Sequence, residues 1–286
     1  MIAIVTDSNS GITQKEAKEL GIYVLPMPFM IEDEIYYEEK DLTQDAFYEK
    51  MAAGAKISTS QPTPEEVTGL WDRVLTAHES LVYIPMSSGL SGSCQTAQLL
   101  AQDYGDRVFV ADNRRISVTQ QRSVEDALHL AQKGDMSAGQ IRDFLEQDGG
   151  NSSIYIMLDT LTYLKRGGRI TPAAAALGNI LRLKPVLQIQ GEKLDAFAKA
   201  RTKAQGKTTM VNAIKNDIAH RFGGRVEDVR LFIAHSHDSA GAEAFREEVK
   251  TEFPGCEIVL RSLSLSIGCH LGPGALALAC AQKHVP

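Results

Sequence analysis

The chain has 286 residues, of which 43% are hydrophobic and 23% are charged, and its formal net charge is -6 at pH 7. This composition is that of an ordinary globular protein, and the length is enough for two compact domains. Nucleic-acid binders usually carry a concentrated basic face, so the acidic balance argues against that class. A small anionic ligand is compatible with it, because backbone N–H groups can hold an anion on an acidic protein.

Several features together predict a soluble, cytoplasmic protein. Residues 1–7 have no basic segment and too short an apolar run for a signal peptide. The longest apolar stretches, 172–181 and 275–281, are shorter than the roughly 20 residues that a membrane span requires. The four cysteines are scattered, with no CxxC pair and no metal-ligand spacing, which favours free thiols in a reducing compartment. We therefore expect no metal, no cofactor and no stable membrane insertion.

Strands and helices alternate through the first half of the chain. A strand at 2–6 ends in a polar turn, and a helix follows at 13–20. The run 22–30 contains Pro26 and Pro28, so we expect an irregular or edge strand there. The remaining elements predicted before residue 150 are a helix at 41–52, a loop at 56–63 with a helix capped by Thr63, a strand at 81–86, a helix at 93–104, a strand at 107–111 and helices at 119–133 and 137–147.

The second half begins after the Gly/Ser-rich segment 149–153, which is the best candidate for a linker between a domain at 1–150 and a domain at 151–286. Two strands flank Gly191 and Glu192 and are expected to pair like a hairpin. The elements predicted here are strands at 154–158, 184–190, 193–200, 229–235 and 256–262, a helical turn at 160–165, and helices at 202–221 and 238–252.

This order of elements predicts the α/β class. Alternation of strand and helix is typical of a parallel sheet covered by helices, and we expect one in residues 1–150. The hairpin-like pair favours a mixed sheet in the second domain. Ligands of open α/β sheets bind at the carboxyl ends of the strands, where the polar segments 6–10, 87–93 and 112–113 fall.

The segment 87–93 (SSGLSGS) is the strongest functional signal in the chain. It follows an apolar strand and precedes a helix, so its hydroxyls and free N–H groups favour an anion at the helix N-terminus. An alternative hypothesis is a serine esterase or acyltransferase, which would use Ser91 or Ser93 with His270. A nucleophile elbow needs glycine at 89 and 93, and only Gly89 is present. A phosphate-binding P-loop is disfavoured because the segment has no lysine, and a capped helix after a tight turn is the structural alternative.

A second hydroxyl-rich loop lies at 57–62 (ISTSQP). Serine and threonine before proline commonly form a turn with a helix cap. Two hydroxyl loops at one sheet edge could instead donate hydrogen bonds to a carboxylate, without the charge that would hinder its release.

Two other polar segments are adequately explained by structural roles. The basic segment 165–169 (KRGGR) is typical of a helix end with a glycine cap, although Arg169 stays available for a phosphate or a partner. His235 and His237 have only Asp238 beside them at ligand spacing, so a structural or surface role is favoured over a metal site.

A single histidine, His270, lies in the glycine-rich segment 267–276. Such a loop brings the backbone close to a ligand or to another segment. A lone loop histidine is usually only solvated, but this glycine frame makes His270 a candidate donor to a carboxylate.

Taken together, these motifs resemble the DegV family of bacterial fatty-acid-binding proteins. The resemblance covers nearly the whole chain and rests on an ordered set of motifs: VTDS at 5–8, TSQP at 59–62, SSGLSG at 87–92, YLKRGGRI at 163–170, KPVL at 184–187 and GPGA at 272–275. It implies a two-domain α/β carrier, not an enzyme, with a long-chain fatty acid in a tunnel between the domains.

The resemblance also implies which residues bind the ligand. The family's carboxylate contacts match Thr59 in TSQP and Ser91 in the LSG motif, with His270 as a third contact. The neighbouring residues of the same loops complete the predicted ligand site: Ser60, Gly89 and Ser93.

A partner and some departures follow from the same comparison. Arg201 matches a family position linked to presenting the acyl group to a separate fatty acid kinase, which forms an acyl phosphate. The family usually has threonine and an aromatic residue where this chain has Ser93 and Cys94, and threonine where it has Leu271. Cys94 and Leu271 are expected to reshape the tunnel, and the preferred chain length and saturation stay open.

Overall fold

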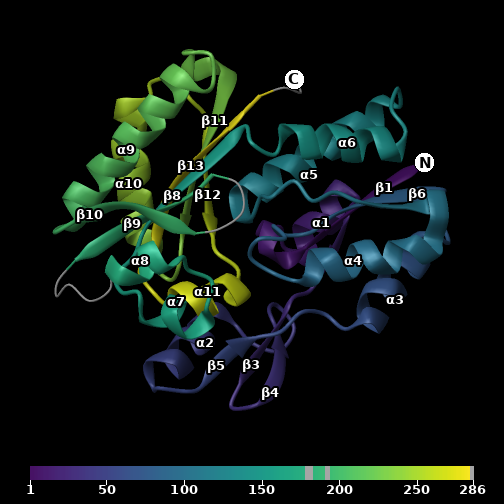
Figure 1. Ribbon diagram of the computed structural model, residues 1–286, viewed down its shortest axis with the longest axis horizontal. Coiled ribbons are helices and arrows are strands. Elements are labelled where there is room, and N and C mark those ends of the chain that lie inside the picture. The colour runs from purple at the N-terminus through teal and green to yellow at the C-terminus, as the bar shows by residue number, and fades with distance from the viewer. Residues whose placement is uncertain (178–182, 191–193, 284–286) are drawn as a thin grey trace.

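The computed structural model describes residues 1–177, 183–190 and 194–283. The predicted turn at 191–192 and the end of the apolar stretch 172–181 lie outside these residues. The described chain forms three sheets with helices packed on them (Figure 1). One sheet is parallel and another is mixed, which confirms the predicted α/β class.

The parallel sheet comes from the first part of the chain and has helices on both faces. Its strand order is β2-β1-β6-β7, with every pair parallel: β1 (Ile2–Asp7), β2 (Tyr23–Leu25), β6 (Ser80–Ile84) and β7 (Val108–Val110). Ile4 and Val82 pack against one set of helices, α1 (Gln14–Leu20), α5 (Ser117–Lys133) and α6 (Ala138–Asp148). Val5 and Leu81 face the other set, α3 (Pro64–Val74) and α4 (Ser93–Ala101). Burial on both faces explains why these strands are continuous apolar runs.

A small antiparallel sheet was not expected from the sequence. Its order is β4-β3-β5, from β3 (Pro28–Ile31), β4 (Glu34–Tyr37) and β5 (Ile57–Thr59), and α2 (Gln44–Ala52) connects β4 to β5. The prediction of one irregular strand at 22–30 is wrong, because the run breaks at Pro26 and Met27 and its two parts join different sheets. The loop expected at 57–59 is a strand, because it pairs with β3.

The mixed sheet has six strands in the order β10-β9-β8-β13-β11-β12. Among its described strands, only β11 and β12 pair in parallel. The strands are β8 (Ser152–Met157), β9 (Lys184–Ile189), β10 (Asp195–Ala200), β11 (Val229–His235), β12 (Ile258–Ser262) and β13 (Leu276–Gln282). Two long helices, α9 (Lys203–His220) and α10 (Ser239–Glu252), cover one face, and the start of α5 packs on the other (Figure 1).

Sequence reasoning missed the strand β13, which lies inside this sheet between β8 and β11. Its alanine-rich sequence, LALACAQ, is weakly β-forming, and its strand state depends on pairing with both neighbours. The remaining elements are the short helices α7 (Thr162–Gly167), α8 (Pro172–Leu177) and α11 (Leu265–Leu271), and the 3-10 turns η1 (Ser8–Ser10), η2 (Gln102–Arg107) and η3 (Val226–Asp228).

The helix α11 corrects the predicted glycine loop at 267–276. His270 lies in the last turn of this helix, and Gly272 follows with φ +71. Gly268 lets α11 approach α2 closely, because a Cβ at this position would lie 2.6 Å from the hydroxyl oxygen of Tyr48. The glycines of this segment therefore serve helix packing and termination.

Each of the two larger sheets draws its strands from one half of the chain. The parallel sheet uses residues up to Val110, and the mixed sheet uses residues from Ser152 onward. The division into folding units at about residue 150 stays a prediction. Within the described residues, no helix is both long enough and apolar enough to cross a membrane.

Candidate functional site

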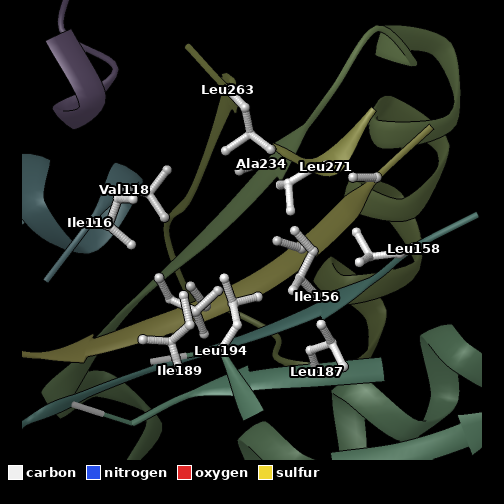
Figure 2. Close-up of a cluster of buried hydrophobic side chains, with 14 of the residues drawn as sticks. Ile116, Val118, Ile156, Leu158, Leu187, Ile189, Leu194, Ala234, Leu263 and Leu271 are labelled. Atoms are coloured by element: carbon white, nitrogen blue, oxygen red, sulfur yellow. The ribbon is translucent and has the colours of Figure 1, made fainter. Parts of the chain in front are cut away.

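A cavity of about 300 Å³ lies where residues from both halves of the chain meet. Its walls are mainly aliphatic side chains of one buried cluster. Figure 2 shows Ile116 and Val118, at the start of α5, on the opposite side of this cluster from Leu271. The aliphatic lining residues are Leu90, Ile116, Val118, Ile154, Ile156, Leu164, Ile189, Leu194, Leu263, Ile267 and Leu271. The volume is within the range of small-molecule sites, and the lining suits an apolar ligand.

Thr59 and His270 form a polar contact at the wall of this cavity. Thr59 is the last residue of β5, and His270 lies in α11. Their side chains are joined by a hydrogen bond between Oγ1 of Thr59 and Nε2 of His270 at 3.0 Å. The strand β5 and the helix α11 pack against each other, which brings together two residues 211 positions apart.

The imidazole of His270 is held neutral at physiological pH. Burial is the main cause, and the positive charge of Arg169 adds to it, so that the pKa of His270 falls to about 4. Nδ1 of His270 is buried and has no hydrogen-bond partner within the described part of the chain. A Cβ on Gly167 would lie 2.1 Å from this nitrogen, so glycine at 167 gives the ring its space.

Ser91 lies in the loop before α4 and also lines the cavity. Its Oγ accepts a hydrogen bond from the backbone N–H of Ser93 at 3.2 Å. The loop is closed by backbone hydrogen bonds from Leu90 and Ser91 to the carbonyl of Ser87, at 3.0 and 3.2 Å. The hydroxyl proton of Ser91 has no acceptor among the described residues, so it can be donated to a ligand.

The structure therefore brings four predicted site residues to one cavity: Thr59, Ser60, Ser91 and His270. Gly89 and Ser93 are not in its wall. The N–H of Gly89 donates to Oγ of Ser87 at 3.2 Å, and Oγ of Ser93 is buried without a partner in the described residues. Gly89 belongs to the loop that carries Ser91, and Ser93 is the first residue of α4, with its backbone N–H bonded to Ser91.

Two further sequence-based expectations concern residues away from the polar wall. Arg201 is exposed just before α9 and outside the cavity, and its backbone N–H donates to Oε1 of Gln205 at 2.8 Å. The expectation that Cys94 shapes the tunnel is wrong, because Cys94 is fully buried between α4 and the parallel sheet. Leu271 does line the cavity.

The two histidines considered as a metal pair have other contacts. The ring of His237 stacks on Tyr48 with centroids 4.7 Å apart, and its Nδ1 lies 3.7 Å from Oδ1 of Asp45. Nδ1 of His235 accepts the backbone N–H of Asp238 at 3.3 Å. Among the residues that the structure describes, no group of three or more His, Cys, Asp or Glu side chains could hold a metal ion.

Five polar residues of the cavity wall were not among the predicted site residues: Asn9, Gln61, Ser117, Arg169 and Ser266. Asn9 belongs to the polar turn after β1, which was noted only as a strand end. Ser117 and Ser266 are single hydroxyls in otherwise apolar surroundings. No spacing rule distinguishes them from ordinary buried serines.

Comparison with known proteins agrees with this architecture. The model of the DegV family, described as an uncharacterised protein family, matches residues 1–283. The chain belongs to the DegV family. Curated DegV relatives include a DegV domain-containing protein of Streptococcus pneumoniae, 30% identical over 97% of each chain. Protein DegV of Bacillus subtilis is 28% identical over 99% of each chain.

Solved DegV structures share the whole fold. A DegV family protein from Thermus thermophilus, solved in a study of its fatty acid binding, is 29% identical with a TM-score of 0.89, covering 98% of this chain and 99% of its own. DegV of Bacillus subtilis, described as a fatty acid binding protein, is 27% identical with a TM-score of 0.86, covering 99% of both chains.

Proposed function

We propose that this DegV protein binds a long-chain fatty acid, with the carboxylate at Thr59, Ser91 and His270 and the alkyl chain in the aliphatic cavity. The observation that carries this proposal is the cavity itself, in which hydroxyl donors meet a wall of leucine, isoleucine and valine. The descriptions of the Thermus thermophilus and Bacillus subtilis relatives as fatty-acid-binding support it.

The two parts of the cavity would contribute differently to binding. Burying an alkyl chain is worth about 0.8 kcal/mol per methylene, or roughly 10 kcal/mol for about 14 methylenes before the costs of ordering and association. A carboxylate can only accept hydrogen bonds, so it needs donors such as the hydroxyls of Thr59 and Ser91. The neutral donors orient the ligand, whereas the apolar wall supplies most of the affinity.

The rival function, an esterase or acyltransferase, has less support from the geometry. Nε2 of His270 is hydrogen-bonded to Thr59, and no hydrogen bond links His270 to Ser91 or Ser93 within the described residues. A histidine whose pKa is about 4 is also a weak general base at neutral pH. We therefore assign the chain a carrier role without chemistry of its own.

The same proposal includes a partner. A carrier that works in the bacterial cytoplasm, as the four free cysteines favour, would present the fatty carboxylate to a separate kinase for acyl-phosphate formation. The exposed guanidinium of Arg201 is the proposed contact. Arg201→Ala should retain fatty acid yet lose acyl-phosphate formation with a purified fatty acid kinase subunit and ATP, whereas Arg225→Ala, at another exposed arginine, should keep both. Undiminished acyl-phosphate formation in Arg201→Ala contradicts this contact.

The decisive experiment is to denature the purified protein and identify the released ligand by mass spectrometry. Wild-type protein should release a long-chain fatty acid, and Ser91→Ala should release much less. Ser88→Ala is the matched control, because Ser88 lies in the same loop but outside the cavity wall. Equal lipid content in Ser91→Ala and wild type would remove Ser91 from the site, and covalent labelling of Ser91 by a fluorophosphonate would favour the esterase.

A further inference from the structure

The aliphatic cavity contains a second polar group of side chains, separate from Thr59 and Ser91. It consists of Asn9, Ser117 and Ser266, which we call the inner polar cluster. All three residues are more than nine-tenths buried, with exposed fractions of 2%, 7% and 7%. The three come from different parts of the chain, namely η1, the first residue of α5 and the first turn of α11.

A hydrogen bond joins two of these residues, and the packing of α5 on η1 brings the helix that carries the third beside them. Oγ of Ser266 donates to Oδ1 of Asn9, which also accepts from Oγ of Ser264 at 2.9 Å. The start of α5 packs against η1, where Nε2 of Gln120 donates to Oδ1 of Asp7 at 3.1 Å. The three residues therefore line one cavity, and the elements η1 and α5 that carry two of them pack directly on each other.

The hydrogen-bonding capacity of this cluster is not used up by the protein. Nδ2 of Asn9 donates to Sδ of Met86 at 2.8 Å, but a thioether is a weak acceptor. The Ser117 hydroxyl has no hydrogen bond to any described residue, although the side chain lines the cavity. Ser117 also has φ +57, a conformation that serine rarely adopts. Buried polar groups usually have partners, so this free hydroxyl points to a group supplied by the ligand.

The unused hydrogen-bond donors and acceptors of the inner polar cluster determine which functional group of a ligand would fit there. Asn9 and Ser117 offer N–H and O–H donors, whereas Oγ of Ser266, whose proton is used toward Asn9, offers lone pairs. A hydroxyl both accepts and donates, so it satisfies both kinds of position. A keto group or a double bond does not.

We propose that the preferred ligand is a hydroxy fatty acid, whose chain hydroxyl binds at the inner polar cluster. This inference rests on the proposed fatty-acid function and names the substrate class of the same cavity. Ser266 and His270 are four residues apart in α11, about one turn or roughly 6 Å along the axis. The hydroxyl of the ligand is therefore expected in the part of the alkyl chain nearer the carboxylate.

The test compares stearic acid with a positional series of monohydroxystearic acids, using delipidated protein and calorimetry. One positional isomer should bind about tenfold more tightly than isomers whose hydroxyl falls against the aliphatic wall, because those leave a buried hydroxyl unpaired. Ser117→Ala should abolish the difference between isomers, while stearic acid should still bind. Ser266→Ala provides an independent second variant, and Ser88→Ala should behave like wild type.

The outcomes separate this inference from the function on which it rests. If stearic acid binds but every hydroxystearic isomer binds equally or more weakly, the hydroxyl site is refuted and the fatty-acid function stands. If a preferred isomer persists in both Ser117→Ala and Ser266→Ala, the inner polar cluster is not the site. If neither stearic acid nor any isomer binds, the proposed function itself fails.

Discussion

The Nε2 atom of His270 lies 3.0 Å from Oγ1 of Thr59. This threonine hydroxyl is the hydrogen-bond partner of the imidazole within the described chain, since Nδ1 has none there. With Nε2 protonated, the ring donates to Thr59 and leaves the threonine proton free for a carboxylate. The opposite tautomer would bury an unpaired Nδ1–H and consume the proton of Thr59. The proposed carboxylate site thus requires the first tautomer, in which His270 positions Thr59 as a donor.

Removing the hydroxyl of Thr59 should weaken fatty-acid binding. Thr59→Val keeps the shape of the side chain but loses a hydrogen bond to a charged acceptor, worth about 1.5–3 kcal/mol. The Kd for stearic acid should rise by at least about tenfold in a calorimetric titration. Ser58→Ala, at the exposed neighbouring position whose side chain points to the opposite face of β5, should leave the Kd unchanged. An unchanged Kd in Thr59→Val would show that Thr59 does not hold the carboxylate.

The stability of the protein should depend on pH through His270. Its pKa is lowered to about 4 in the folded state, so the unfolded chain binds the proton first as the pH falls. The contribution is complete above the unfolded pKa of about 6.5 and is lost as the pH falls to about 4, by about 3 kcal/mol. Urea unfolding at pH 7 and pH 4.5 should show this loss in wild type relative to His270→Gln.

The difference between wild type and His270→Gln isolates this histidine from other buried groups. Burial raises the pKa of Asp7 and of Asp126 to about 6, so both favour folding at acid pH, opposite to His270. These carboxyl groups are present in both proteins and cancel in the comparison. Parallel stability curves for the two proteins between pH 4.5 and 7 would contradict the assignment.

Filling the space at Gly167 should disturb the site without removing any of its functional groups. A Cβ there would lie 2.1 Å from Nδ1 of His270, so Gly167→Ala must displace the ring or the end of α7. We expect a lower melting temperature and weaker binding of stearic acid. Gly69→Ala, in α3 with no atom within 4 Å of the new Cβ, should be neutral or slightly stabilising. Wild-type affinity in Gly167→Ala would mean that the position of the ring is unimportant.

A buried ion pair within the first half of the chain should contribute strongly to the stability of the fold. Nη2 of Arg115 donates to Oδ2 of Asp148 at 2.8 Å, and Nη1 donates to Oγ of Ser123 at 2.9 Å, with the guanidinium almost fully buried. Arg115→Met leaves the carboxylate of Asp148 without its guanidinium and should lower the free energy of unfolding by about 3–5 kcal/mol in urea titrations. The exposed Arg225→Met should change it little, and equal stability of both variants would argue against the ion pair.

Local sequence signals predicted several residues of the proposed carboxylate site but not how the fold brings them together. The Ser/Gly loop before α4 was recognisable because a strand end and a helix start lie close together in the chain. Thr59 was recognisable from its motif, but its strand β5 depends on pairing with β3, about thirty residues earlier. His270 was recognised in a glycine-rich segment whose glycines allow α11 to pack and end.

By itself, the sequence determined the α/β class, the alternating elements of the first half and the hydroxyl loops at strand ends. These features follow from periodicity, caps and turn residues, which act over a few positions. Only the tertiary structure decided that β13 lies inside the mixed sheet and that Asn9, Ser117 and Ser266 share one cavity wall. Such relationships arise from strand pairing and helix packing between distant segments, and no local sequence pattern predicts them.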